Sequence, residues 1–182
     1  MVIGAQEPRI KVVPDGDEHP RWAEVEEFVG RLGYVLDKWQ WNVLRAALLR
    51  QGDQWAAFTV AVCAPRQNGK NSLLEVLELV KTVLLGEKLL IHTAHLADTS
   101  KEAFHRLDAL IDTNEWLDGE LRHIWRANGM EMIEFTGGRR IRFRTRTRGG
   151  GRGYANCSTA IFDEAMFLPE VSMAAIFPVI TA

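Results

Sequence analysis

The chain has 182 residues, of which 47% are hydrophobic and 25% are charged, and its formal net charge is −2. These values are typical of a globular protein, and a chain of this length can bury a core as one domain. No apolar run approaches the ~20 residues of a membrane helix, and the first residues lack the regions of a signal peptide. Cys63 and Cys157 lie in or beside apolar runs, which favours packed thiols in a reducing compartment over a disulfide scaffold.

The predicted elements alternate between helices and strands. After an irregular leader over 1–20, we expect helices at about 21–31, 36–50, 71–85 and 97–113, and core strands at 57–63, 88–93 and 159–162. Residues 115–130 favour a short helix, 131–135 and 140–145 a hairpin, 148–153 a glycine-rich loop, and 165–177 a helix broken near Pro169. This order predicts an α/β fold with a mostly parallel sheet, helices on both faces and a site at the carboxyl edge.

A phosphate-binding loop is indicated between the strand at 57–63 and the next helix. The run Ala64-Pro65-Arg66-Gln67-Asn68-Gly69-Lys70-Asn71-Ser72 joins them, and a tight strand-to-helix loop points backbone N–H groups at an anion. Gly69 allows close approach of the backbone, and Lys70 can reach the β- and γ-phosphates of a nucleotide. Ala64 stands where this motif begins with Gly, and Asn71 stands where Ser or Thr binds magnesium, so an ordinary strand-to-helix turn is the alternative.

Two adjacent carboxylates end the last predicted strand. Asp163 and Glu164 follow the apolar run at 159–162. In P-loop ATPases the first acid at this position holds magnesium, and the second orients and deprotonates the attacking water. A helix capped by Asp163 is the alternative, but the two motifs together, 93 residues apart from Lys70 to Asp163 (163 minus 70), predict ATP hydrolysis.

Seven arginines and no acid occur between residues 139 and 152. They are Arg139, Arg140, Arg142, Arg144, Arg146, Arg148 and Arg152. Such a run either forms a solvated face or contacts phosphates, of DNA or of the nucleotide on a neighbouring subunit.

Several other side chains have two interpretations. Gln40 can contact an adenine edge through its amide or can be a helix surface residue. We expect Trp116, Trp125 and Cys63 to pack in the core, and Trp39 to be a core residue, with a stacking platform as the alternative. His92 and His95 lack further ligands at metal-binding spacing, so structural or DNA-facing roles are favoured over zinc.

With these motifs, the chain resembles the ATPase half of a tailed-phage large terminase, the motor that pumps DNA into the procapsid. Leu36-Asp37-Lys38-Trp39-Gln40 is similar to the family's adenine-binding element, and Pro65–Lys70, with Arg four residues before Lys, is similar to its P-loop. Gly149-Gly150-Gly151-Arg152-Gly153-Tyr154 is similar to the loop before its acidic strand, and Ile161–Ala165 to that strand. The resemblance covers roughly residues 34–182.

The resemblance implies a P-loop NTPase of the RecA (ASCE) class that uses ATP and Mg²⁺. It assigns catalysis to Glu164, Lys70, Arg66 and Arg152, nucleotide binding to Gln40, Pro65, Arg66, Gln67, Asn68, Gly69, Lys70, Asn71 and Ser72, and magnesium to Asp163 and Asn71. Ser72 is the alternative magnesium ligand. We further expect Arg152 to reach the nucleotide of a neighbouring subunit, with Arg66 acting in cis and Arg148 as the rivals.

The implied partners are double-stranded DNA, a homo-oligomeric ring on a portal and a small terminase subunit, in the host cytoplasm and without a membrane. We expect residues 1–33 to be a leader and 34–182 to be the ATPase domain, cut short near Pro178–Ala182. The family's ribonuclease-H-type nuclease domain has no counterpart, so we expect a fragment. A DEAD-like helicase fragment and a nucleotide-binding module without hydrolysis are the two alternative functions.

Overall fold

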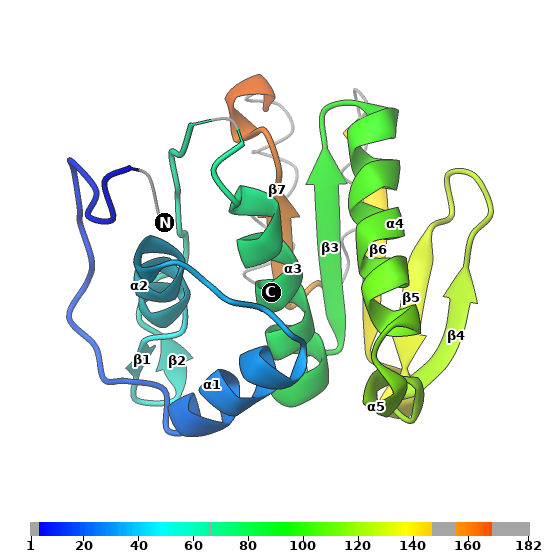
Figure 1. Cartoon of the computed structure of the whole chain (residues 1–182), viewed down its shortest axis with the longest axis horizontal. Helices are drawn as coiled ribbons and strands as arrows, with labels where there is room; N and C mark the ends of the chain where they lie inside the picture. Colours follow the sequence, from blue (N-terminus) through cyan, green and yellow to red (C-terminus); the bar gives the residue numbers. More distant parts are fainter. Residues whose placement is uncertain (1–3, 66, 147–155, 169–182) are drawn as a thin grey trace. The chain divides into compact units, whose positions relative to one another are not determined.

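The computed structural model describes residues 4–65, 67–146 and 156–168. It divides the chain into two compact units, Met1–Leu77 and Glu78–Ala182 (Figure 1). The first unit contains α1 (Trp22–Arg31), α2 (Lys38–Ala47), a short hairpin of β1 (Arg50–Gln51) and β2 (Gln54–Trp55), and most of α3 (Lys70–Leu79). Among the described residues, no helix combines the length and hydrophobicity needed to cross a bilayer.

The helices of the first unit form where their apolar residues recur at helical spacing. On α1, Trp22, Val25, Phe28 and Val29 are buried on one side, which is the pattern of an amphipathic helix. The Trp22 ring packs edge-on against Trp41 of α2. The predicted helix at 36–50 is shorter than expected, because residues 50–51 pair with β2 across a turn at Gly52, whose φ is +61°.

The segment predicted as the first core strand is not a strand in the structure. Residues 58–63 are exposed and carry no strand partner among the described residues. Phe58, Val60 and Val62 are 59%, 46% and 40% exposed. A strand forms only where a neighbouring strand satisfies its backbone N–H and C=O groups, so this segment stays irregular. Cys63 is also exposed, and the prediction that it packs in the core was wrong.

The second unit is built on a five-stranded sheet in the order β4-β5-β6-β3-β7. Along the chain it contains the π-helix η1 (Val80–Leu84), β3 (Leu89–Ala94), α4 (Ala97–Asp112), α5 (Glu115–Asp118), β4 (Leu121–Trp125), β5 (Met132–Phe135), the 3₁₀ turn η2 (Thr136–Gly138), β6 (Arg140–Thr145), β7 (Thr159–Phe162) and the 3₁₀ turn η4 (Ala165–Phe167). β3 is parallel to β6 and β7, whereas β4–β5 and β5–β6 are antiparallel. The sheet is therefore mixed rather than mostly parallel.

α4 covers one face of this sheet, over β6 and β3 (Figure 1). Ala103, Phe104, Leu107 and Ile111 form its buried stripe, and the Phe104 ring meets Phe143 of β6 edge-on at 5.5 Å. Among the described residues of this unit, the opposite face carries no helix, so the prediction of helices on both faces is confirmed for one face alone.

The local predictions for this unit are largely confirmed, with one exception. The helix at 71–85 is present as α3 followed by η1, and β3, α4, the hairpin β5–β6 and β7 are all present. Residues 121–125, however, form the strand β4 rather than a helix, because pairing with β5 outweighs their helix-like apolar spacing. Trp116 and Trp125 are half-buried rather than in the core. Predictions for 148–153 and for 169–177 lie outside the described residues.

Candidate functional site

The segment predicted to bind phosphate lies in the first unit and leads directly into α3. Gly69 has a φ of +74°, a backbone conformation that favours glycine, and a Cβ added there would push aside the Gln40 side-chain amide, whose Nε2 would lie 2.9 Å away. α3 begins at the next residue, Lys70, and its first turn carries Asn71 and Ser72. The first N–H groups of a helix have no intrahelical acceptor and favour an anion. Arg66 lies outside the described residues.

Gln40 of α2 is hydrogen-bonded to this loop. It is only 4% exposed, its Nε2 donates to the Gly69 carbonyl at 2.7 Å, and its Oε1 accepts the Asp37 N–H at 2.6 Å. Both ends of the amide are thus bound to the backbone of the first unit. An adenine contact from Gln40 would have to replace these bonds and stays a prediction.

A second hydrogen bond connects α3 to the rest of the first unit. The Tyr34 hydroxyl donates to Glu75 Oε2 on α3, and Glu75 is buried. Together with Gln40, this contact anchors the helix that follows the loop to the segment around α2. A loop held in this way needs little rearrangement to bind phosphate, which lowers the cost of binding.

In the second unit, the two predicted acids lie at the carboxyl end of β7. The Asp163 N–H donates to the Thr93 carbonyl at 2.8 Å and extends the pairing with β3 by one residue. The Glu164 N–H donates to Asp163 Oδ1 at 2.8 Å. The backbone of Glu164 has the left-handed helical conformation, with φ 52° and ψ 49°. Asp163 is 5% exposed and Glu164 is half-buried. The chain thus turns sharply between the two carboxylates.

Arg146 clamps this turn, a role that the sequence did not indicate. Its Nη2 donates to the carbonyls of Asp163 at 2.7 Å and Glu164 at 3.1 Å. Its Nη1 donates to Thr93 at the end of β3, at 2.9 Å to the carbonyl and 3.2 Å to Oγ1. One guanidinium therefore joins the ends of two parallel strands and holds the backbone of both acids.

The remaining arginines of the basic run have separate surroundings. Arg139 donates to Glu120 at 2.6 Å and to the Val83 carbonyl at 2.6 Å, so its role is structural. Arg140, Arg142 and Arg144 lie on β6. Arg148 and Arg152 lie outside the described residues, and the prediction for Arg152 is untested.

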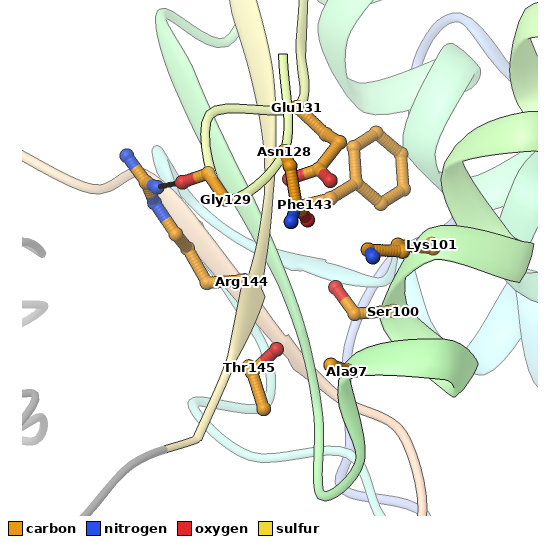
Figure 2. Close-up of a pocket in the computed structure, with 9 residues that line it drawn as sticks. All are labelled: Ala97, Ser100, Lys101, Asn128, Gly129, Glu131, Phe143, Arg144 and Thr145. Carbon is orange, nitrogen blue, oxygen red and sulfur yellow. Dashed lines mark hydrogen bonds between the residues drawn. The ribbon is translucent and has the colours of Figure 1, made fainter. Parts of the chain in front are cut away.

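Among the described residues of the second unit, His92 and His95 make structural contacts, and the pocket in Figure 2 is small. His92 is buried and its Nδ1 contacts Glu78 Oε1, and the His95 ring stacks on Phe167. No cluster of His, Cys, Asp and Glu suited to a metal ion occurs in the described part of the chain. The pocket in Figure 2, between α4, β6 and the loop before β5, has a volume of about 120 Å³, well below the ~300 Å³ of typical ligand sites.

Comparison with known proteins supports the fold. No family model and no curated protein matches the chain. Among solved structures, the ATPase domain of the large terminase of Thermus phage P74-26 matches with a TM-score of 0.63 at 16% identity, over 94% of this chain and 66% of that one. An arginine-to-alanine variant of the same domain matches with a TM-score of 0.63 at 17% identity, over 86% of this chain and 64% of that one.

The chain thus spans about two thirds of the length of the structures that it matches. At 16–17% sequence identity, these matches show similarity of fold alone. The resemblance to a large-terminase ATPase domain is confirmed at that level.

Proposed function

We propose that this chain is an ATP-hydrolysing domain of a motor that packages double-stranded DNA, of the kind to which large terminases belong. The observation that carries the proposal is the turn at the end of β7, where two adjacent carboxylates are held at a strand end by Arg146 and Thr93. The P-loop sequence before α3 and the likeness in fold support it.

The loop of the first unit would bind the phosphates. Backbone N–H groups at the start of α3 favour the negative charge, and Lys70 would add a positive charge at the β- and γ-phosphates. Gly69 lets the backbone come close, and Gln40 keeps the loop in this shape. The same loop assigns Pro65, Gln67 and Asn68 to nucleotide contacts.

The acids of the second unit would supply the chemistry. Mg²⁺ is commonly bound through one or two carboxylates together with substrate phosphates and water, so a single carboxylate such as that of Asp163 would be enough to hold this ion. Asn71 or Ser72 of the P-loop sequence stays the expected second ligand. When bound, Mg²⁺ neutralises the charge that develops on the phosphates. Glu164 would orient the attacking water and accept its proton.

An arginine from the basic run would complete the reaction. A guanidinium near the γ-phosphate is worth ~10³–10⁵ in rate in phosphoryl transfer. We assign this role to Arg152, acting on a neighbouring subunit of a ring, with Arg66 as the rival in cis. If Arg152 acts in trans, mixing Arg152→Ala with Lys70→Ala protein restores activity, because some interfaces then pair an intact P-loop with an intact arginine. No restoration in the mixture would favour Arg66.

The experiment that tests the proposal is phosphate release from ATP and Mg²⁺ by the purified chain, with and without double-stranded DNA. We expect hydrolysis that depends on Mg²⁺ and that DNA alters. ATP binding without phosphate release in either condition would point instead to a nucleotide-binding module. A portal, a small terminase subunit and the host cytoplasm belong to the same proposal and call for experiments on the assembled motor.

A further inference from the structure

A row of three arginines runs along one face of β6. Arg140, Arg142 and Arg144 alternate with the buried Ile141 and Phe143, and α4 covers the face of those two apolar residues. The arginines therefore lie on the opposite face. Figure 2 shows this for Arg144, whose side chain extends away from Ser100 and Lys101 of α4.

The charge of this row is not balanced within the described part of the unit. The strand register places Met132 opposite Arg142 and Glu134 opposite Arg140. Glu134, however, pairs with Arg122 of β4 at 3.2 Å. Arg142 Nε contacts Met132 Sδ at 3.3 Å, and Arg144 donates to the Gly129 carbonyl. Neither partner is charged, and among the described contacts none of the three row arginines forms an ion pair.

Like charges in this row repel one another. Burial lowers the pKa of Arg142 below its usual value, and the charges of Arg140 and Arg144 lower it further. Alternate residues of a strand lie ~6.8 Å apart, so the three arginines leave the backbone of β6 at even intervals. An anionic partner with charges along its length would relieve this repulsion at all three positions.

We infer that the face of β6 that carries Arg140, Arg142 and Arg144 binds the phosphate backbone of double-stranded DNA. The inference rests on the proposed function, which supplies DNA as the partner. Arginine suits phosphate because its planar donors match two phosphate oxygens. Trp125, the aromatic residue of β4 near this face, is half-buried and packs edge-on against His123 at 4.2 Å. The described face thus lacks the open row of rings on which single-stranded bases stack.

The test is the salt dependence of binding to a labelled DNA duplex of arbitrary sequence, followed by fluorescence anisotropy without nucleotide. Each phosphate contact contributes ~0.9 to the slope of log K against log salt. The double variant Arg142→Gln/Arg144→Gln is therefore expected to flatten the slope by about 1.8. Arg142→Lys/Arg144→Lys keeps both charges and should keep the slope.

The matched control is Lys101→Gln/Arg106→Gln, which removes the same charge from α4 on the other face of the sheet. It should leave the slope unchanged, and thermal unfolding should show that every variant is folded. Equal flattening in both double glutamine variants, or an unchanged slope in Arg142→Gln/Arg144→Gln, overturns the inference. Wild-type protein that binds no duplex overturns it as well.

ATP hydrolysis without DNA separates this inference from the proposed function. The arginine row lies outside the proposed catalytic groups, so Arg142→Gln/Arg144→Gln should hydrolyse ATP at the wild-type rate when DNA is absent. Loss of DNA binding with retained hydrolysis supports the inference. If Arg142→Gln/Arg144→Gln binds DNA like the wild type and hydrolyses ATP normally, the inference is refuted and the proposed function is unaffected. If the wild-type protein does not hydrolyse ATP, the proposed function itself is contradicted.

Discussion

Replacing Arg146 by alanine removes the clamp that holds the turn of the two acids. The variant loses the hydrogen bonds to the Asp163 carbonyl at 2.7 Å and the Thr93 carbonyl at 2.9 Å, together with two longer ones. Hydrogen bonds from a charged donor contribute ~1.5–3 kcal/mol each. Because Arg146 is half-buried, we take the lower figure for the two short bonds and expect a loss of about 3 kcal/mol in the free energy of unfolding.

The effect on catalysis should exceed the effect on nucleotide binding. Glu164 is held in a left-handed conformation, which costs a residue other than glycine ~1–2 kcal/mol. Without Arg146 the turn can relax and move the carboxylate, and a shift of ~1 Å costs ~100-fold in rate. We expect kcat for ATP to fall about 100-fold while KM changes less than about threefold, the pattern of a lost transition-state interaction.

The assay is steady-state phosphate release at saturating Mg²⁺, with urea unfolding of the same preparations. Arg144→Ala is the control, since Arg144 lies on β6 two residues before Arg146 and donates to the Gly129 carbonyl instead. Arg146→Lys should have a kcat and a stability between those of the wild type and Arg146→Ala. A single ammonium group cannot donate to Thr93 and to the turn with the geometry of the two guanidinium nitrogens. A folded Arg146→Ala protein with wild-type kcat, or an equal loss in Arg144→Ala, would refute the reasoning.

Four further predictions concern Gln40, Glu78 and the two cysteines. Gln40→Ala should weaken ATP binding and cost about 1–2 kcal/mol in unfolding free energy, because it frees the phosphate-binding loop; unchanged ATP affinity by titration would contradict this. Glu78→Ala should cost about 1–3 kcal/mol in urea unfolding by leaving the buried His92 Nδ1 without this hydrogen-bond partner, and no measurable loss would show that the contact is dispensable. At pH 8 iodoacetamide should modify the exposed Cys63 and spare Cys157, whose pKa burial raises to about 11. Stability should fall as the pH rises from 9 toward 11, because the unfolded thiol ionises first; equal labelling of both cysteines at pH 8 would be evidence against this burial.

The sequence predicted the elements whose signals are local. α4 follows from apolar residues at helical spacing, and the β5–β6 hairpin from alternation across two glycines. The segment at 57–63 has an equally good strand pattern but stays irregular, and β4 forms where a helix was predicted. In both cases the outcome depends on whether a strand partner is present, which a single segment of sequence does not reveal.

The same distinction applies to the candidate site. Gly69 before a helix and two acids after a strand are local patterns, and the structure has them where the sequence indicated. Arg146 could not be singled out from a run of seven arginines, because all but one of its hydrogen bonds described above go to backbone carbonyls, 17 to 53 residues away in the sequence. Every residue has a backbone carbonyl, so the sequence does not reveal which carbonyls accept these hydrogen bonds. Only the fold shows which arginine holds the turn.

In the proposed function, Glu164 is the base that accepts the proton of the attacking water, and Lys70 holds the phosphates of ATP. The most direct measurement compares ATP binding and single-turnover hydrolysis in Glu164→Gln and Lys70→Ala. We predict that Glu164→Gln binds ATP as tightly as the wild type but loses at least ~100-fold in hydrolysis, because an amide cannot accept the proton of water. Lys70→Ala should lose binding and hydrolysis together. Hydrolysis near the wild-type rate by folded Glu164→Gln protein would contradict the account.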